Sequence, residues 1–252
     1  MIRLGVTLPQ PFNFKGGNSA VILLHTFAGS PMDVQILGRN VQRAGYTVVG
    51  PAFSGHATAD PANIFLQGNP TQWWADTQLA VNQLKAAGHD QIAIFGESLG
   101  GLFAIKAMEE LPNIVAGGTI STPLFPIDTS RVADRFLQDA RAWYEKIGTP
   151  SETLTSKMAF LTEQIHLTLR AIGDYTVPIH DKLNVIKQPT FIAQPDADEL
   201  IYRTVGPRLA ETLQDQTMVS YHHYPDAPHV MTYSPQGRVL ADDLVAFLKT
   251  VF

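Results

Sequence analysis

A serine between two glycines, where an apolar run gives way to a helix-forming run, constrains this chain more than any other feature. The run is Phe95-Gly96-Glu97-Ser98-Leu99-Gly100-Gly101. In a G-x-S-x-G pattern the serine sits on a sharp strand-to-helix turn, and side chains two residues to either side would collide with neighbouring backbone. Gly96 and Gly100 carry no such side chains. The pattern predicts that Ser98 is a nucleophile held on this turn.

Short apolar runs alternate with helix-forming stretches along most of the chain. The strand candidates are 20–25, 47–49, 91–95, 115–120, 190–194 and 218–222. The helix candidates are 31–44, 71–87, 102–110, 202–213 and 235–251. This alternation predicts an α/β domain in which helices cover both faces of a mostly parallel sheet.

The alternation stops after Ile120 and resumes only at Thr190. A stretch of this length is rarely bare loop, and it contains two helical patterns, 130–146 and 151–172, the second ending at Gly173. Ser130 and Ser151 are the expected N-caps. We therefore expect a helical cap at 123–184, inserted into a core domain formed by 1–122 and 185–252.

The first cap helix has an apolar face. Val132, Phe136, Ala140 and Trp143 recur at spacings of three and four residues, which places them on one side of a helix. Two interpretations remain open at this point. The face either packs on the body of the protein as core or lines a substrate pocket.

Composition and charge exclude several classes of partner. The net charge is −5 with no cluster of basic residues, which disfavours nucleic acid and anionic membrane surfaces. The absence of cysteine excludes disulfides, thiolate catalysis and Cys-ligated metal sites. We see neither a secretory signal nor the run of about 20 apolar residues that a membrane span needs. We therefore expect a cytoplasmic protein.

A serine hydroxyl becomes a good nucleophile only when a base takes its proton and an acid orients that base. On folds with this turn the chain order is serine, acid, histidine. His229 follows the last strand candidate in a turn-rich loop, where open α/β sheets place catalytic groups. We expect His229 to be the base. The other histidines after Ser98 fall in the cap, before a strand or at a strand end: His166, His180, His222 and His223.

Three carboxylates follow the strand candidate at 190–194. They are Asp196, Asp198 and Glu199. Asp198 stands where the loop would turn back toward His229, which favours it as the orienting acid. The residues alone leave Asp196 as a close alternative.

The negative charge that develops on an attacked carbonyl needs backbone N–H donors. Leu99 follows the nucleophile and opens a helix, so its N–H is one expected donor. The second is expected in the loop after the strand candidate 20–25, at Phe27 N–H. His25 in the same segment is expected to be a buried histidine that satisfies the loop backbone.

These segments together resemble the small bacterial carboxylesterases of the α/β-hydrolase fold that are related to monoacylglycerol lipases. The likeness covers nearly the whole chain. The matching segments are 21–29 (family L-L-H-G-F-x-G), 33–45 (first helix), Gly55-His56 (G-H-G loop), Trp73-Trp74, 96–101 (G-L-S-L-G-G), Gln194 with Asp198-Glu199 (Q-x-x-x-D-E) and 228–230 around the base.

The resemblance implies a mostly parallel central sheet flanked by helices, with a small helical cap inserted after the sixth strand. It assigns the acid to Asp198. Trp73 and Trp74 belong either to the core or to an interface, and we expect the core. The resemblance also implies a serine carboxylesterase that forms an acyl-enzyme on Ser98 without cofactor or metal. Short- to medium-chain esters are the expected substrates, with monoacylglycerols among the candidates.

The resemblance is compatible with other functions as well. A thioesterase, a hydroxycinnamoyl esterase or a lyase-like member could use the same triad, and a non-catalytic ligand-binding relative is a further alternative. The expected partner is a small-molecule ester, with no nucleic acid and no integral membrane association. The chain is expected to be a monomer or weak homodimer.

Two positions depart from the family pattern. Thr26 and Ala57 stand where the family has glycine. If the backbone at position 26 needs a positive φ, a β-branched threonine would be strained there. We expect a reshaped acyl pocket in which Phe27 N–H remains the donor.

Overall fold

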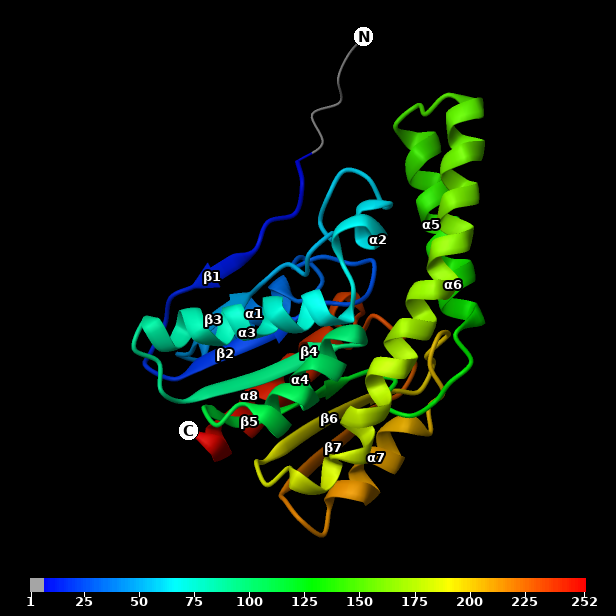
Figure 1. Cartoon of the computed structure of the whole chain (residues 1–252). Coiled ribbons are helices and arrows are strands. Elements are labelled where there is room, and N and C mark those ends of the chain that lie inside the picture. The colour runs from blue at the N-terminus through cyan, green and yellow to red at the C-terminus, as the bar shows by residue number, and fades with distance from the viewer. Residues whose placement is uncertain (1–6) are drawn as a thin grey trace.

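The computed structural model describes residues 7–252, which build a seven-stranded sheet. The strands lie in the order β1-β3-β2-β4-β5-β6-β7 (Figure 1). All neighbours pair in parallel except β1 and β3, which are antiparallel. The strands are β1 Phe12–Phe14, β2 Ala20–Leu24, β3 Thr47–Gly50, β4 Ile92–Glu97, β5 Ile114–Ile120, β6 Thr190–Pro195 and β7 Val219–Tyr224.

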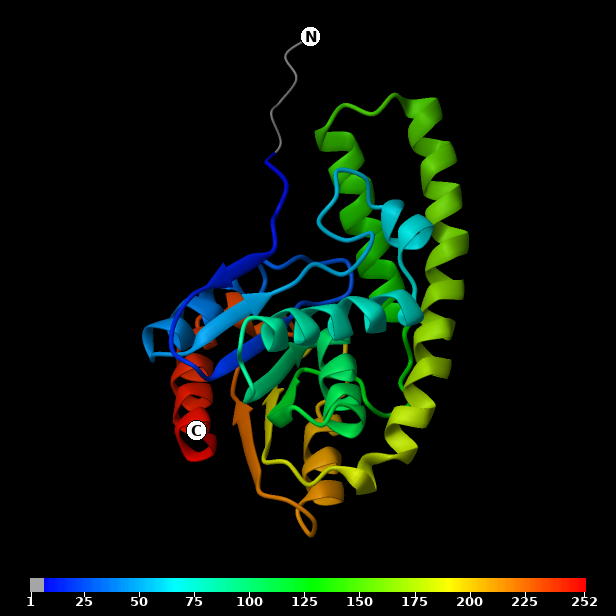
Figure 2. The same cartoon turned by 60° about the vertical axis from the view of Figure 1, so that its left-hand side comes forward.

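Helices cover both faces of this sheet. Helices α1 and α8 pack on one face, and α3, α4 and α7 on the other (Figures 1 and 2). The helices are α1 Gln35–Arg43, α2 Asn63–Gln67, α3 Pro70–Ala86, α4 Leu99–Glu110, α5 Ser130–Lys146, α6 Ser151–Asp181, α7 Val205–Leu213 and α8 Gly237–Val251, with short 3-10 turns η1 Leu183–Val185 and η2 Met231–Tyr233.

The central strands read as continuous apolar runs because both of their faces are buried. In β2, Val21 and Leu23 face α1 and α8, whereas Ala20, Ile22 and Leu24 belong to the core on the opposite face. The predicted α/β fold with a mostly parallel sheet is therefore confirmed.

Helices α5 and α6 form a hairpin that extends beyond the carboxyl ends of the strands (Figures 1 and 2). Along the described chain this insertion follows the fifth strand, β5, and not a sixth, because β1 is the one described strand ahead of β2. On α5, Phe136 and Ala140 are buried as the apolar spacing predicted.

Several expected element boundaries were wrong. Helix α6 runs through Gly173 to Asp181, because its face beyond the glycine, including Thr176 and Ile179, is buried against the rest of the protein. That packing outweighs the roughly 1 kcal/mol that a mid-helix glycine costs. The N-caps are Thr129 and Pro150, and Ser130 and Ser151 are already helical. The side chain of Asp128, and not that of Ser130, binds a backbone N–H at the start of α5: Asp128 Oδ1 accepts the Ser130 N–H at 2.9 Å.

The tryptophan pair lies in the core, as expected. Trp73 is fully buried and its Nε1–H donates to Ser54 O at 3.0 Å, while Trp74 is 9% exposed. In the part of the chain that the structure describes, no helix has both the length and the apolar character that crossing a membrane requires.

Candidate active site

Ser98 lies on a strained turn between β4 and α4. Its backbone has φ 53° and ψ −116°, and its N–H donates to Ile120 O at 2.8 Å. A Cβ added at Gly96 would run into the backbone of Gly100, and one added at Gly100 would run into the backbone of β2 at Leu24. The two glycines are therefore required for the turn, as the motif indicated.

Strained backbone gathers at one edge of the sheet. Among residues 7–252, the non-glycine residues with positive φ are Ala28, Ala57, Ser98, Ser121 and Asp226. They follow β2, β3, β4, β5 and β7 respectively, so all of them lie in loops at the carboxyl ends of the parallel strands. Backbone strain tends to concentrate at functional sites. This edge is therefore the place where a site is expected.

A buried histidine–aspartate pair lies at the same edge. His229 Nδ1 is 2.9 Å from Asp198 Oδ2 and 3.0 Å from Oδ1, and the two side chains are 4% and 0% exposed. Asp198 Oδ1 also accepts the N–H groups of Leu200 and Ile201 at 2.8 and 2.7 Å. With the proton on Nδ1 directed at Asp198, Nε2 is the ring nitrogen left to receive a proton.

The alternative acid, Asp196, has a different partner. Asp196 Oδ2 lies 3.2 Å from His223 Nδ1, and these side chains are 40% and 62% exposed. His222 on the same strand faces Asp243 of α8, with 3.5 Å between Nδ1 and Oδ2. The structure thus brings Asp198, and not Asp196, against His229.

Two further carboxylates hold the loop that carries His229. Glu199 Oε2 accepts the backbone N–H of His229 at 3.0 Å. Glu97, the residue before Ser98, accepts the N–H of Thr232 at 3.2 Å and its hydroxyl at 2.8 Å. Neither role is predicted by the sequence. Glu199 stood beside the expected acid as a weak signal, but nothing local pairs Glu97 with a residue so far along the chain.

The loop after β2 is built on His25. The Nδ1–H of His25 donates to Thr26 O at 2.8 Å, and its Nε2 accepts the Phe53 N–H at 3.0 Å. Burial lowers the pKa of His25 to about 4, so the ring is neutral and both of its nitrogens are satisfied by backbone. The prediction that His25 has a structural role is confirmed.

The two expected oxyanion donors come from neighbouring strands. Strands β2 and β4 pair in register, with Leu24 opposite Gly96, so Phe27 and Leu99 follow adjacent strand ends. Leu99 is the first residue of α4, where backbone N–H groups are not used within the helix. Both N–H groups therefore lie at the same edge of the sheet as Ser98.

Thr26 is not strained. Its φ is not positive; within this loop the positive φ, 59°, falls on Ala28. Thr26 Oγ1 donates to Asp33 Oδ2 at 2.9 Å, and the Ser30 N–H donates to the same oxygen at 3.0 Å. The departure from glycine thus adds a hydrogen bond to the loop. At the other departure, Ala57 has a φ of 56°, a conformation that glycine adopts more easily.

The helical hairpin is fastened over this edge. Asp60, in the loop after β3, accepts hydrogen bonds from Tyr144 of α5 and Lys157 of α6. Trp143 Nε1–H donates to Ala59 O at 2.9 Å. The ring of Phe136 on α5 packs on Phe27, with 5.9 Å between the centroids. An aromatic surface from the hairpin therefore meets the loop that carries the expected oxyanion donor.

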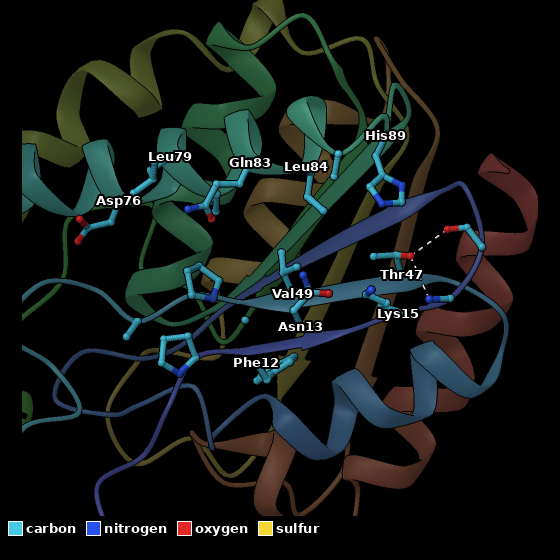
Figure 3. A pocket seen from close by; sticks show the side chains of 18 of the residues that line it. Phe12, Asn13, Lys15, Thr47, Val49, Asp76, Leu79, Gln83, Leu84 and His89 are labelled. Carbon is cyan, nitrogen blue, oxygen red and sulfur yellow. Dashed lines mark hydrogen bonds between the residues drawn. The ribbon is translucent and has the colours of Figure 1, made fainter.

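A cavity of about 700 Å³ lies elsewhere, between α3 and the strands β1 and β3 (Figure 3). Its lining includes Asn13, Lys15, Val49, Gln83 and His89. It is separate from the loops that carry Ser98, Asp198 and His229. Within the described residues there is no group of three or more His, Cys, Asp or Glu side chains suited to holding a metal ion.

The order of strands and the loops that carry serine, aspartate and histidine define an α/β-hydrolase. Comparison with known proteins agrees. Residues 17–166, more than half of the chain, match the Hydrolase_4 family, described as serine aminopeptidase, S33. The chain belongs to this family.

Individual relatives are ester hydrolases by name. A carboxylesterase of Bacillus subtilis (strain 168) is 29% identical over 244 residues, covering 97% of this chain and 98% of the relative. A thermostable monoacylglycerol lipase of Bacillus sp. (strain H-257) is 30% identical over 107 residues, covering 42% and 41%. A structure described under LipS and LipT, two metagenome-derived lipolytic enzymes, aligns with a TM-score of 0.70 at 21% identity, covering 96% and 97%.

Proposed function

We propose that this protein hydrolyses carboxylic esters through an acyl-enzyme on Ser98. The observation that carries the proposal is the buried His229–Asp198 pair, on loops at the same sheet edge as the strained Ser98 turn. The full-length likeness to a protein named carboxylesterase supports the ester as the substrate class.

In the proposed mechanism, His229 Nε2 takes the proton of Ser98 Oγ as this oxygen attacks the ester carbonyl. The N–H groups of Leu99 and Phe27 hold the negative carbonyl oxygen, and loss of one such donor typically costs about 3–4 kcal/mol. The protonated His229 then gives its proton to the leaving alcohol. His229 then takes a proton from water as the water oxygen attacks the acyl carbonyl. The same proton passes from His229 to Ser98 Oγ as the acyl–Oγ bond breaks and the acid leaves.

We further propose that residues 123–184 act as a cap whose aromatic face contacts the acyl chain. Phe136 packs on Phe27, and Phe65 lies between Phe136 and Phe160, with centroid distances of 5.3 and 6.5 Å. Such apolar walls favour short- to medium-chain acyl groups, with monoacylglycerols as candidate substrates. On this proposal the partner is a small-molecule ester, and the chain acts as a monomer or weak homodimer.

A substrate panel run on wild type and Ser98→Ala tests the proposal. We expect turnover of p-nitrophenyl esters and monoacylglycerols, and a loss of about 10⁴-fold or more in kcat for Ser98→Ala. An organophosphonate should label wild type once, at Ser98. Preferred turnover of acyl-CoA or hydroxycinnamate esters would indicate the alternative hydrolases. If the protein neither turns over any ester nor reacts with the organophosphonate, the remaining alternative is a non-catalytic ligand-binding protein.

A further inference from the structure

The residue before the proposed nucleophile is a fully buried carboxylate. Glu97 ends β4 and its exposed fraction is 0%, at a position where the resembling family has leucine. Burying a charged carboxylate costs several kcal/mol unless it is paired or hydrogen-bonded, and an apolar side chain would fill this place without that cost. The hydrogen-bond partners of Glu97 should therefore account for its burial.

Both oxygens of Glu97 bind one residue, Thr232. The backbone N–H of Thr232 donates to Oε1 at 3.2 Å and its hydroxyl donates to Oε2 at 2.8 Å. Thr232 is itself buried and lies in η2, three residues after His229. These bonds tie the strand that carries the nucleophile to the turn that carries the base.

The loop around His229 is thereby held on two sides. On the acid side, Glu199 binds the backbone N–H of His229, and the Ala197 N–H donates to Ala227 O at 3.1 Å. On the nucleophile side, the Met231 N–H donates to His229 O at 3.1 Å, and Glu97 holds the next residue, Thr232. Displacement of Thr232 would therefore be transmitted to the imidazole.

Burial changes the protonation of Glu97. It raises the pKa of Glu97 to about 7, whereas the Thr232 hydrogen bonds and the nearby His229 lower it. Asp33, in the loop between β2 and α1, raises it further.

We infer that Glu97 is a positioning residue, which holds the loop of His229 against the end of β4, next to the Ser98 turn, through Thr232. The kinetic part of this inference rests on the proposed function. The positioning part does not, because the His229 ring can be observed without turnover.

Three variants test the inference: Glu97→Leu, Glu97→Gln and Thr232→Val. Thr190→Val is the matched control, because Thr190 is equally buried but lies at the amino end of β6. We expect Glu97→Leu and Thr232→Val to lower kcat about 10- to 100-fold, since small misplacements of a catalytic group have effects of this size. KM should change less than about threefold, in keeping with a role in the transition state.

Glu97→Gln separates the hydrogen bonds from the charge. Glutamine retains an acceptor for Thr232, so kcat should fall less than in Glu97→Leu. Thr190→Val should leave kcat unchanged.

The proton NMR signal of the His229 Nδ1–H gives a readout that needs no substrate. We expect it to shift or broaden in Glu97→Leu and Thr232→Val and to stay in place in Thr190→Val. If the folded variants keep wild-type kcat and NMR signal, the inference is overturned. If Glu97→Leu does not fold, Glu97→Gln and Thr232→Val decide the matter. If wild type hydrolyses no ester but the signal moves as expected, the proposed function fails and the positioning role stands.

Discussion

At the scale of single residues, backbone conformation and buried charge set the properties of the site loops. Ala57 occupies a left-handed conformation where the resembling family has glycine. A non-glycine residue pays about 1–2 kcal/mol in that region, and glycine loses roughly 0.5–1 kcal/mol through its freer unfolded chain. The balance favours glycine at this position.

We therefore expect Ala57→Gly to raise the free energy of unfolding by about 0.5–1 kcal/mol. Urea denaturation measures this change in the free energy of unfolding. Ala159→Gly is the control, because Ala159 is exposed within α6 and the same substitution there should lose about 1 kcal/mol. An equal loss in both variants would mean that position 57 gains nothing from glycine.

Buried Glu97 makes stability depend on pH. Its pKa rises from 4.5 to about 7 on folding, so between these values the folded state binds more protons than the unfolded chain. Its contribution to stability is present below about pH 4.5 and is lost as pH rises through about 7. The wild type should lose roughly 3 kcal/mol more than Glu97→Gln across this window. Urea titrations at pH 5 and pH 8 measure the free energy of unfolding of both proteins. The prediction is contradicted if wild type and Glu97→Gln lose the same amount between the two pH values.

At the scale of elements, packing outweighs local propensity wherever the two disagree. Strands β2, β4 and β6 could be predicted within one or two residues, because strands buried on both faces read as apolar runs. The three-residue β1 directly after Pro11 could not, since its place depends on antiparallel pairing with β3. The end of α6 could not be predicted from Gly173, because the length of this helix depends on what its last turns pack against.

Helix α6 should gain stability from Gly173→Ala. Beyond the backbone of α6 itself, a Cβ added there meets open space, and the backbone is helical, so we expect a gain of about 1 kcal/mol. Gly148→Ala is the matched control. Its added Cβ also meets open space, but its φ is 74°, so we expect a loss of about 1 kcal/mol. Thermal unfolding followed by circular dichroism compares them, and a loss at position 173 would contradict the argument.

At the scale of the whole molecule, the parallel sheet brings distant segments to one edge. The chain order of serine, acid and base made Ser98 and His229 candidates, because Ser98 stands directly after a strand and His229 lies in the loop that follows the last strand. Both Asp196 and Asp198 follow β6, so the expected turn of the loop favoured Asp198 only slightly, and the resemblance assigned it. The hydrogen bonds between Glu97 and Thr232 join residues 135 positions apart, so they could not be predicted without the folded arrangement of β4 and η2.

On the proposed mechanism, Ser98, His229 and Asp198 work together to hydrolyse carboxylic esters. The most direct measurement is kcat/KM on a p-nitrophenyl ester for Asp198→Asn beside Asp196→Asn. We expect a fall of about 10⁴-fold for Asp198→Asn, which would lose the correct tautomer of His229, and a change within a few-fold for the exposed Asp196. Equal effects, or a larger loss at position 196, would contradict the account.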